Sequence, residues 1–408
     1  MLIKYEFLKI LRRKSTIITM VVSLIVTAFL FGLPALQYQT YNQDGVITGS
    51  EGISYTKEQI APYSVLLTDE YIAQTVQDYQ QLFANPDNVG FDGTDKYLVG
   101  DAYWNFVAPQ EDLLGIISGN YDDPGVITDY YNKLPGLDLT NGANFYQTRN
   151  KKIETFFTLR GMSDAQKDYW RSLNSNVDTP FQYGYYEGWD IITSCFELVL
   201  VAIAAICIVI APVFSGEYQA GTDAVILSAK FGKTKLVTAK IVASLLFGLL
   251  AFTIHMVIAF GLPLMAFGVD GWNLPLQIAN TVIPYPLTFM QATFINLGVI
   301  YLVLIAMIAL TLLLSAKMKS PYLVLTVIVP VLFVPMFLAA NGTTGTYNLT
   351  LFLLPYNATK PRYASYITYQ FGGLVMNTFT ARAVLYVVLT AIMLPLAKLG
   401  FKKHQVSA

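Results

Sequence analysis

The chain has 408 residues, of which 54% are hydrophobic and only 13% carry charge. A soluble globular domain usually carries about 25% charged residues, so the composition excludes an ordinary soluble protein. The formal net charge is −1, and residues 37–189 hold 21 acidic against 9 basic residues, which excludes the basic surface of a nucleic-acid-binding protein.

The first 14 residues precede any apolar run, and their apolar side chains have helical spacing. Charged residues fall on the opposite face, which predicts an amphipathic helix lying in the cytoplasmic membrane interface. The alternative is a plain basic flank that only orients the first span. The apolar positions are Ile3, Phe7, Ile10 and Leu11.

Six apolar segments predict membrane-spanning helices, because a helix of about 20 residues crosses a hydrocarbon core about 30 Å thick. A further apolar stretch, 272–289, is broken by three prolines, and we interpret it as an interfacial or re-entrant piece. A secretory signal peptide is an alternative for the first segment, although that segment is long and no small-residue cleavage site follows it. The six predicted spans are 15–36, 190–214, 241–267, 291–316, 322–340 and 383–399.

Lysine and arginine residues gather in four segments that alternate with acidic or weakly charged ones. They lie before the first span, between the second and third, between the fourth and fifth, and after the sixth. The positive-inside rule places such segments in the cytoplasm. An even number of spans with both termini inside satisfies all four clusters.

Residues 37–189 form a polar insert that this orientation places outside the cell. About 150 residues can bury a core of their own. Capping-box spacing at Thr56-x-x-Gln59 and Ser163-x-x-Gln166 predicts two helix starts. We therefore expect a mostly helical extracellular domain with a few short strands at most. It contains no cysteine, so it folds without disulfides.

Four aromatic residues lead from this domain into the second span, at Tyr183, Tyr185, Tyr186 and Trp189. Such a cluster is typical of an interfacial aromatic belt. A platform for a carbohydrate or a peptide is the alternative.

Residues 341–382 form a second, smaller outside stretch. Its half-apolar segments are too short or too polar to span a membrane. We interpret them as a hairpin that dips into the outer leaflet.

The loop 215–240, between the second and third spans, is the most informative part of the sequence. The apolar run stops at Phe214, and a short amphipathic piece around Ile226 precedes a basic cluster. A cytoplasmic helix held between two spans is suited to docking a soluble partner and pushing on both spans together. The alternative is a connecting loop whose lysines only enforce topology, and composition alone slightly favours it.

This loop resembles the signature of the permease subunits of the ABC type-2 transporter family. The family pattern is Glu, a Gly-Thr pair, a Leu-Leu-like pair, an Arg and a closing Lys. Lysine replaces the usual arginine at 233 and the usual proline at 230, and lysine cannot form a bidentate fork. The matching residues are Glu217, Gly221, Thr222, Ile226, Leu227, Lys233 and Lys240.

The resemblance also covers the N-terminal helix, the six spans and the re-entrant stretch before the last span. A large insert after the first span is typical of a subset of these permeases, many from Gram-positive bacteria. In the family the loop is the coupling helix, which seats in a cleft of the ATPase subunit. The resemblance therefore implies a pump in the bacterial plasma membrane with two permease chains, identical or paralogous, and two ATPase chains.

The roles that follow for single residues are hypotheses. Glu217 would orient the loop or bond to the interfacial helix. Gly221 would permit close approach of the partner's backbone, and Thr222 would cap the following turn.

The chain lacks a phosphate-binding loop of the form G-x-x-x-x-G-K-[ST]. Gly232-Lys233-Thr234 matches its end, but Leu227 occupies the position of the first glycine. We therefore expect no catalytic activity from this chain and no cofactor on it, with ATP and Mg²⁺ on the partner subunit. The sequence also shows no metal site.

Polar residues inside predicted spans are costly and suggest function. Glu197, His255 and Asn296 would line a substrate path. The alternative, that they pair with neighbouring helices or reach the interface, is slightly favoured.

These features predict the permease of an ATP-driven exporter. Two alternatives stay open, a membrane-anchored sensor or scaffold that binds a ligand outside, and an ion-coupled secondary transporter. The sequence does not indicate the substrate.

Overall fold

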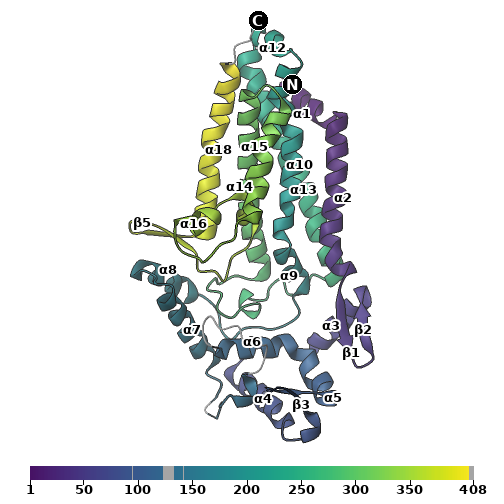
Figure 1. The fold of residues 1–408 in the computed structure, drawn as a ribbon, viewed down its shortest axis with the longest axis vertical. Coiled ribbons are helices and arrows are strands. Elements are labelled where there is room, and N and C mark those ends of the chain that lie inside the picture. Colours follow the sequence, from purple (N-terminus) through teal and green to yellow (C-terminus); the bar gives the residue numbers. More distant parts are fainter. Residues whose placement is uncertain (94, 123–132, 141, 404–408) are drawn as a thin grey trace.

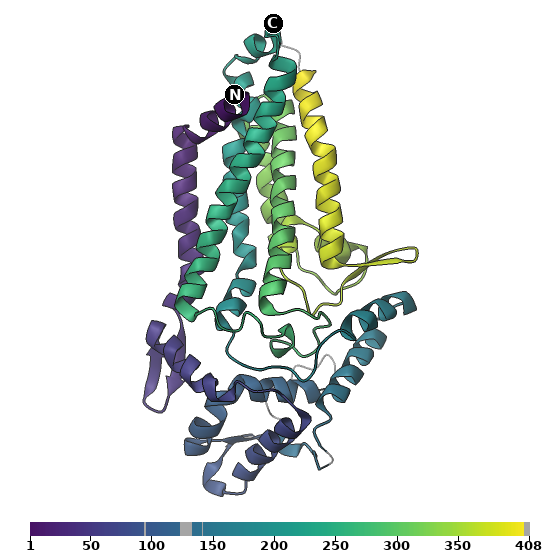
Figure 2. The ribbon, with the colours of Figure 1, turned by 180° about the vertical axis from the view of Figure 1, so that it is seen from behind.

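The computed structural model describes residues 1–93, 95–122, 133–140 and 142–403. Among these residues, five helical segments are long and apolar enough to cross a membrane, and they form a bundle in Figures 1 and 2. The expectation of an all-α membrane protein is confirmed as a mostly helical one, and the described residues also include three two-stranded sheets. The segments are α2 (Lys14–Leu36), Phe196–Gln219 with α10 (Leu200–Ile210) and α11 (Pro212–Gln219), Gly232–Phe267 with η7 (Gly232–Leu236) and α13 (Val237–Phe267), α14 (Phe289–Lys317) and α18 (Thr378–Lys402).

The fifth predicted span, 322–340, is occupied by a shorter apolar segment, Pro321–Phe337. It consists of α15 (Pro321–Phe333) and a 3-10 turn, η9 (Val334–Phe337). Pro330 lies inside α15 and Pro335 inside η9, and each proline removes a backbone donor, which shortens the regular helix. α15 nevertheless packs beside α10 and α14 in the bundle (Figure 1).

The second predicted span, 190–214, has different boundaries in the structure. Residues 187–194 form a separate helix, α9 (Glu187–Ser194), which ends at Cys195. The long segment starts at Phe196 with a 3-10 turn, η6 (Phe196–Val199), and continues to Gln219. The helical segment extends five residues beyond Phe214, where the apolar run ends, and these residues include Glu217.

The 37–189 domain lies at the end of the bundle away from α1 (Leu2–Leu11) and from the last residues of α18 (Figure 1). Its described residues include two antiparallel hairpins, β1 (Gln39–Asn42) with β2 (Gly45–Thr48) and β3 (Val89–Asp92) with β4 (Asp95–Leu98). Its other elements are helices, with short 3-10 and π turns between them. The helices are α3 (Gly49–Ile60), α4 (Asp69–Leu82), α5 (Gly100–Ala102), α6 (Glu111–Tyr121), α7 (Phe145–Leu159), α8 (Asp164–Asn174) and α9.

One of the two predicted capping boxes is present. The Ser163 hydroxyl accepts from the Gln166 amide and the Gln166 side chain accepts from the Ser163 amide, at the start of α8. The prediction at Thr56 is wrong, because α3 already begins at Gly49, directly after the β1–β2 hairpin. The Thr56 hydroxyl instead accepts a hydrogen bond from Tyr38.

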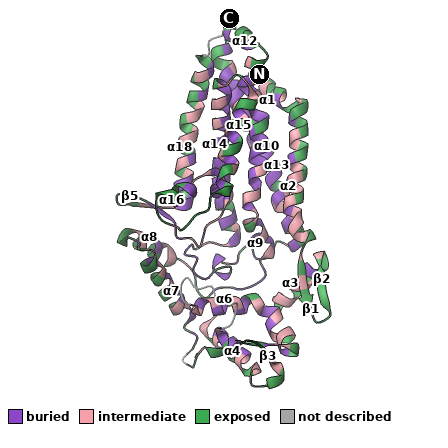
Figure 3. Cartoon of the chain, in the orientation of Figure 1, coloured by how far each residue is buried: buried purple, intermediate pink, exposed green. Residues whose placement is uncertain are grey.

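The segment 272–289 is held by the 37–189 domain. The buried Arg149 of α7 donates to the carbonyls of Thr281 (2.5 Å) and Ile283 (2.9 Å). A 3-10 turn, η8 (Leu276–Ile278), packs with the domain in one apolar core, visible as buried residues between the domain and the bundle in Figure 3. Arginine supplies five donors in a fixed fork, which suits two neighbouring carbonyls.

The predicted aromatic belt is not found. Tyr183, Tyr185 and Trp189 are buried inside the protein, and Tyr183 and Trp189 belong to the core that joins the domain to 272–289. The Trp189 indole donates to the carbonyl of Val269 at 3.0 Å. The residue types of 183–189 match those of an aromatic belt. In the structure, however, these rings pack against the segment that follows α13.

The stretch 341–382 folds against the bundle and around Arg382. Arg382 of α18 is 0% exposed and donates to the carbonyls of Phe352, Asn357 and Lys360. β5 pairs with β6 as a short antiparallel hairpin, and the dip of the half-apolar segments into the outer leaflet stays a prediction. The elements are α16 (Thr346–Leu351), α17 (Pro355–Thr359), which packs on α14, β5 (Thr368–Phe371) and β6 (Leu374–Asn377).

We expect the stability of the chain to fall as the pH rises from about 5 to about 7.5, in part because of Glu187. Burial, and to a lesser degree Asp190 and Asp112, raises the pKa of Glu187 from 4.5 to about 7. Between these values the folded chain keeps a proton that the unfolded chain has released, so rising pH favours unfolding, by at most about 3 kcal/mol.

The measurement is the thermal midpoint of the full chain in detergent across this pH window. Glu187→Gln should show a smaller decline than the wild type, because glutamine carries no titrating proton. Equal declines in both proteins would contradict the assignment.

Candidate coupling site

The loop 215–240 forms three short helical pieces at the end of the bundle that also carries α1 (Figure 1). α11 continues the second apolar segment to Gln219. α12 (Asp223–Ser228) follows after a turn, and the π turn η7 leads directly into α13. The amphipathic piece predicted around Ile226 is therefore the six-residue helix α12.

Glu217 is the centre of a polar network under this loop. Its carboxylate accepts hydrogen bonds from Lys240 (2.8 Å), Lys9 (2.6 Å) and the Thr222 hydroxyl (2.6 Å). Both Glu217 and Lys240 are buried, at 8% and 1% side-chain exposure. Because a buried charge is costly without partners, this geometry fixes α11, α13 and the loop relative to one another.

The interfacial helix α1 is tied into the same network. Lys9 bonds to Glu217, and Glu6 accepts from Lys240 at 3.0 Å. The sequence places Lys9 and Glu6 on the polar face of the N-terminal helix, but it does not indicate that they pair with Glu217 and Lys240. Burial lowers the pKa of the neighbouring Arg13, whereas Glu217 and Glu6 act in the opposite direction.

The apolar residues predicted for the interfacial helix occupy different environments. Ile10 is buried in the core of the bundle, and Phe7 packs against Phe247 of α13 with ring centroids 6.4 Å apart. Leu11 is exposed. α1 is therefore held against α13 by packing and by the Glu6–Lys240 ion pair, and against α11 by the Lys9–Glu217 ion pair.

Gly221 and Thr222 shape the turn between α11 and α12. Gly221 has φ +65°, a left-handed conformation that favours glycine after a helix end. Thr222 occupies the N-cap position of α12, but its side chain makes no cap hydrogen bond. The expectation that Thr222 caps the following turn is wrong, because its hydroxyl donates to Glu217 instead.

The remaining residues of the predicted set divide between the interior and the surface. Leu227 is a buried residue of α12, whereas Lys233 is exposed. Val225, at 72% exposure, and Phe231 are exposed apolar residues of the loop. The exposed surface of the loop thus includes Val225, Phe231 and Lys233, while Glu217 and Lys240 are buried.

Gly232 is expected to tolerate no side chain. A Cβ atom at this position would lie 1.6 Å from the carbonyl oxygen of Ile226, which is backbone and cannot move aside easily. Gly232→Ala should therefore displace α12 from η7 and raise protease cleavage within 215–240. Gly261→Ala, in α13 with open space at its Cβ, is the matched control and should leave cleavage unchanged. Equal cleavage in all three proteins would contradict the packing.

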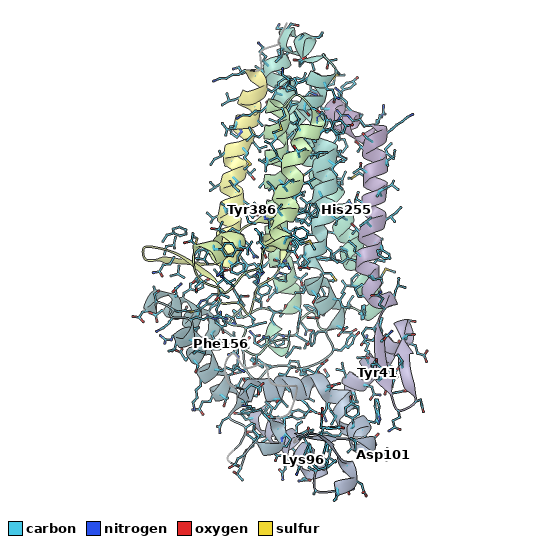
Figure 4. All side chains as sticks on the ribbon, viewed as in Figure 1. Tyr41, Lys96, Asp101, Phe156, His255 and Tyr386 are labelled. Atoms are coloured by element: carbon cyan, nitrogen blue, oxygen red, sulfur yellow. The ribbon has the colours of Figure 1, made fainter. Side chains whose placement is uncertain are left out.

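Of the three residues predicted to line a substrate path, two meet at the end of α17 and the third lies elsewhere. Glu197 pairs with Lys360 at 2.5 Å, and Asn296 donates to the carbonyl of Thr359 at 2.9 Å, so both meet the end of α17. His255, labelled in Figure 4, instead faces α2, with Ser23 Oγ 3.0 Å from its Nε2. Each thus has a partner on another element.

Within the described residues, no group of three or more His, Cys, Asp or Glu side chains is placed to hold a metal ion. The polar network around Glu217 joins two acids, two lysines and the Thr222 hydroxyl.

Comparison with known proteins decides the family. The model of the family described as "ABC-2 family transporter protein" matches residues 1–406. The chain belongs to the ABC-2 transporter family. No curated protein and no solved structure matches it significantly.

As an ABC-2 family member, the chain is a membrane-embedded permease of an ABC transporter. Permeases of this family are normally non-catalytic subunits, and the family implies association with an ABC ATPase subunit and with the membrane. The resemblance drawn from the 215–240 loop is therefore confirmed at the level of the family.

Proposed function

We propose that the chain is the permease of an exporter and that a separate ATPase chain drives it through the 215–240 loop. The observation that carries this proposal is the network centred on Glu217. Through Lys9, Lys240 and Thr222 it joins the loop to α1 and α13. A push on α12 is therefore transmitted to two long helices and the interfacial helix as one unit.

The arrangement of the helices supports six crossings with both termini in the cytoplasm. α1 and the last residues of α18 lie at the same end of the bundle (Figure 2). Five crossings would place them at opposite ends, so α15 supplies the sixth. The lysines around η7 and at the end of α18 lie at that end, which the positive-inside rule assigns to the cytoplasm. The 37–189 domain is then extracellular.

The exposed part of the loop supports docking of a soluble chain. Val225 and Phe231 are apolar and exposed, and Lys233 and Lys235 add positive charge beside them. Interface cores are commonly apolar with a polar rim. A second permease chain, identical or paralogous, would complete the pump, and the substrate would leave along a path between the two permeases.

The test is purification of the tagged full chain from its own membrane in a mild detergent. An ABC ATPase chain should co-purify at about one copy per permease, and the complex should hydrolyse ATP. Val225→Glu should reduce the co-purified ATPase, whereas Val46→Glu, an exposed valine of the 37–189 domain, should not. Recovery of the chain without an ATPase would contradict the proposal and favour a sensor or scaffold.

A further inference from the structure

A cavity of about 140 Å³ lies in the 37–189 domain close to the point where the chain leaves α2. Tyr38, two residues beyond the end of α2, forms part of its wall together with Tyr41 of β1 and Tyr55 of α3. Figure 4 labels Tyr41 beside the first hairpin, near this junction. The cavity is therefore built by elements that are distant from the Glu217 network.

The lining of this cavity is aromatic and acidic. Tyr183 completes a set of four tyrosines, and Glu111 and Asp112, from the first turn of α6, supply two carboxylates. Of the residues that the structure describes, no Lys, Arg or His lines it. Lys57 of α3, the nearest basic residue along that helix, is bonded to Asp270 at 2.5 Å instead.

Two of the lining groups have no hydrogen-bonding or ion-pair partner among the residues that the structure describes. Tyr183 is 1% exposed, and its hydroxyl makes no hydrogen bond to any other described residue. Asp112 forms no ion pair or side-chain hydrogen bond within the described part of the chain. Burial raises the pKa of its carboxyl. The Tyr38 hydroxyl, by contrast, is used by Thr56, which holds that ring in place. The cavity thus offers an uncompensated carboxylate and a free hydroxyl.

The chemistry of these groups selects an organic cation. Aromatic faces and carboxylates together attract ammonium groups, and quaternary ammonium ligands are bound by such aromatic cages. A cavity of about 150 Å³ holds a molecule of the size of benzene, which matches a trimethylammonium group. A metal ion is disfavoured, because the described residues place no three metal-ligating side chains together.

We propose that this cavity binds the alkylammonium group of a small cationic ligand, with Asp112 as the counter-charge and the tyrosines as the cage. The ligand is either a soluble amine or the head group of a membrane lipid, since the cavity lies beside the end of α2. The proposal is independent of the docking of an ATPase.

The experiment is calorimetric titration of the full chain, in nanodiscs of phosphatidylglycerol, with choline and with its neutral isostere 3,3-dimethylbutan-1-ol. Choline should bind, and the isostere should bind at least about tenfold more weakly. Asp112→Asn should weaken choline binding by about tenfold or more. Glu51→Gln, an exposed acid on α3, is the matched control and should change nothing.

Nanodiscs that contain phosphatidylcholine distinguish the two sources of the ligand. Weaker apparent binding of choline there identifies a lipid head group, and unchanged binding identifies a soluble amine; either result agrees with the proposal. It is overturned if choline does not bind, if the isostere binds equally, or if a folded Asp112→Asn binds like the wild type. If that variant does not fold, the choline and isostere comparison on the wild-type chain decides.

Discussion

Replacement of Arg382 by methionine is expected to destabilise the chain strongly and to release the segment 341–382. The guanidinium donates to the carbonyls of Asn357 (2.7 Å), Phe352 (3.0 Å) and Lys360 (3.0 Å) in a fully buried site. A hydrogen bond to a charged group contributes about 1.5–3 kcal/mol, so loss of all three should cost on the order of 4 kcal/mol or more.

The measurement is the thermal midpoint of the purified chain together with the rate of proteolysis within 341–382. Arg382→Lys should be intermediate, because lysine keeps the charge but lacks the planar fork. Arg362→Met is the matched control on the same segment, because Arg362 donates one hydrogen bond, to the Asn357 side chain. A stability loss in Arg362→Met as large as that in Arg382→Met would contradict the role assigned to Arg382.

Replacement of Lys240 by methionine is expected to be the most damaging change in the coupling site. Lys240 is 1% exposed and joins Glu217 to Glu6. Its removal leaves two acids without their buried cation, and breaking a buried ion pair in this way typically costs about 3–5 kcal/mol. ATP-driven transport should be lost, because α12 would no longer be fixed to α1 and α13.

The control is a substitution of Lys9, the other lysine that pairs with Glu217. Lys9 bonds to Glu217 as well, but its side chain is 47% exposed, and such pairs contribute about 0–1 kcal/mol. Lys9→Met should therefore be much milder. The double variant Glu217→Gln with Lys240→Met should be less destabilised than the sum of the two single variants. Equal losses in Lys9→Met and Lys240→Met would show that burial of the network is unimportant.

Hydropathy predicted the long helices well, because the length of an apolar run is a local property. α2, α13, α14 and α18 start and end within a few residues of the predicted limits. The weakest prediction was the segment with Pro330 and Pro335, where apolar composition continues but regular helical hydrogen bonding does not.

The partners of polar residues could not be predicted in the same way. Glu217 and Lys240 were singled out as motif positions, but their bond to each other and to Glu6 depends on how three helices cross. Arg382 directly precedes the last predicted span, 383–399, and its three carbonyl partners lie 22 to 30 residues away along the chain. Packing of distant segments decides such contacts.

The same limit explains the errors at Thr56 and Thr222. Thr56 has capping-box spacing but lies inside α3, which begins at Gly49. Thr222 stands at the N-cap of α12, but its hydroxyl is bonded to Glu217. Tyr38 donates to Thr56, and Glu217 accepts from Thr222. The position of a helix start and the partner of a polar side chain both depend on neighbouring segments, which a local spacing does not describe.

The central claim, that the 215–240 loop receives the ATPase, is tested most directly by photo-crosslinking in intact cells. A photoreactive amino acid at Val225, which is 72% exposed on α12, should give an adduct with the ATPase chain. The same amino acid at Val46, exposed in the β1–β2 hairpin, should give none. An adduct from Val46 only, or from neither position, would contradict the account.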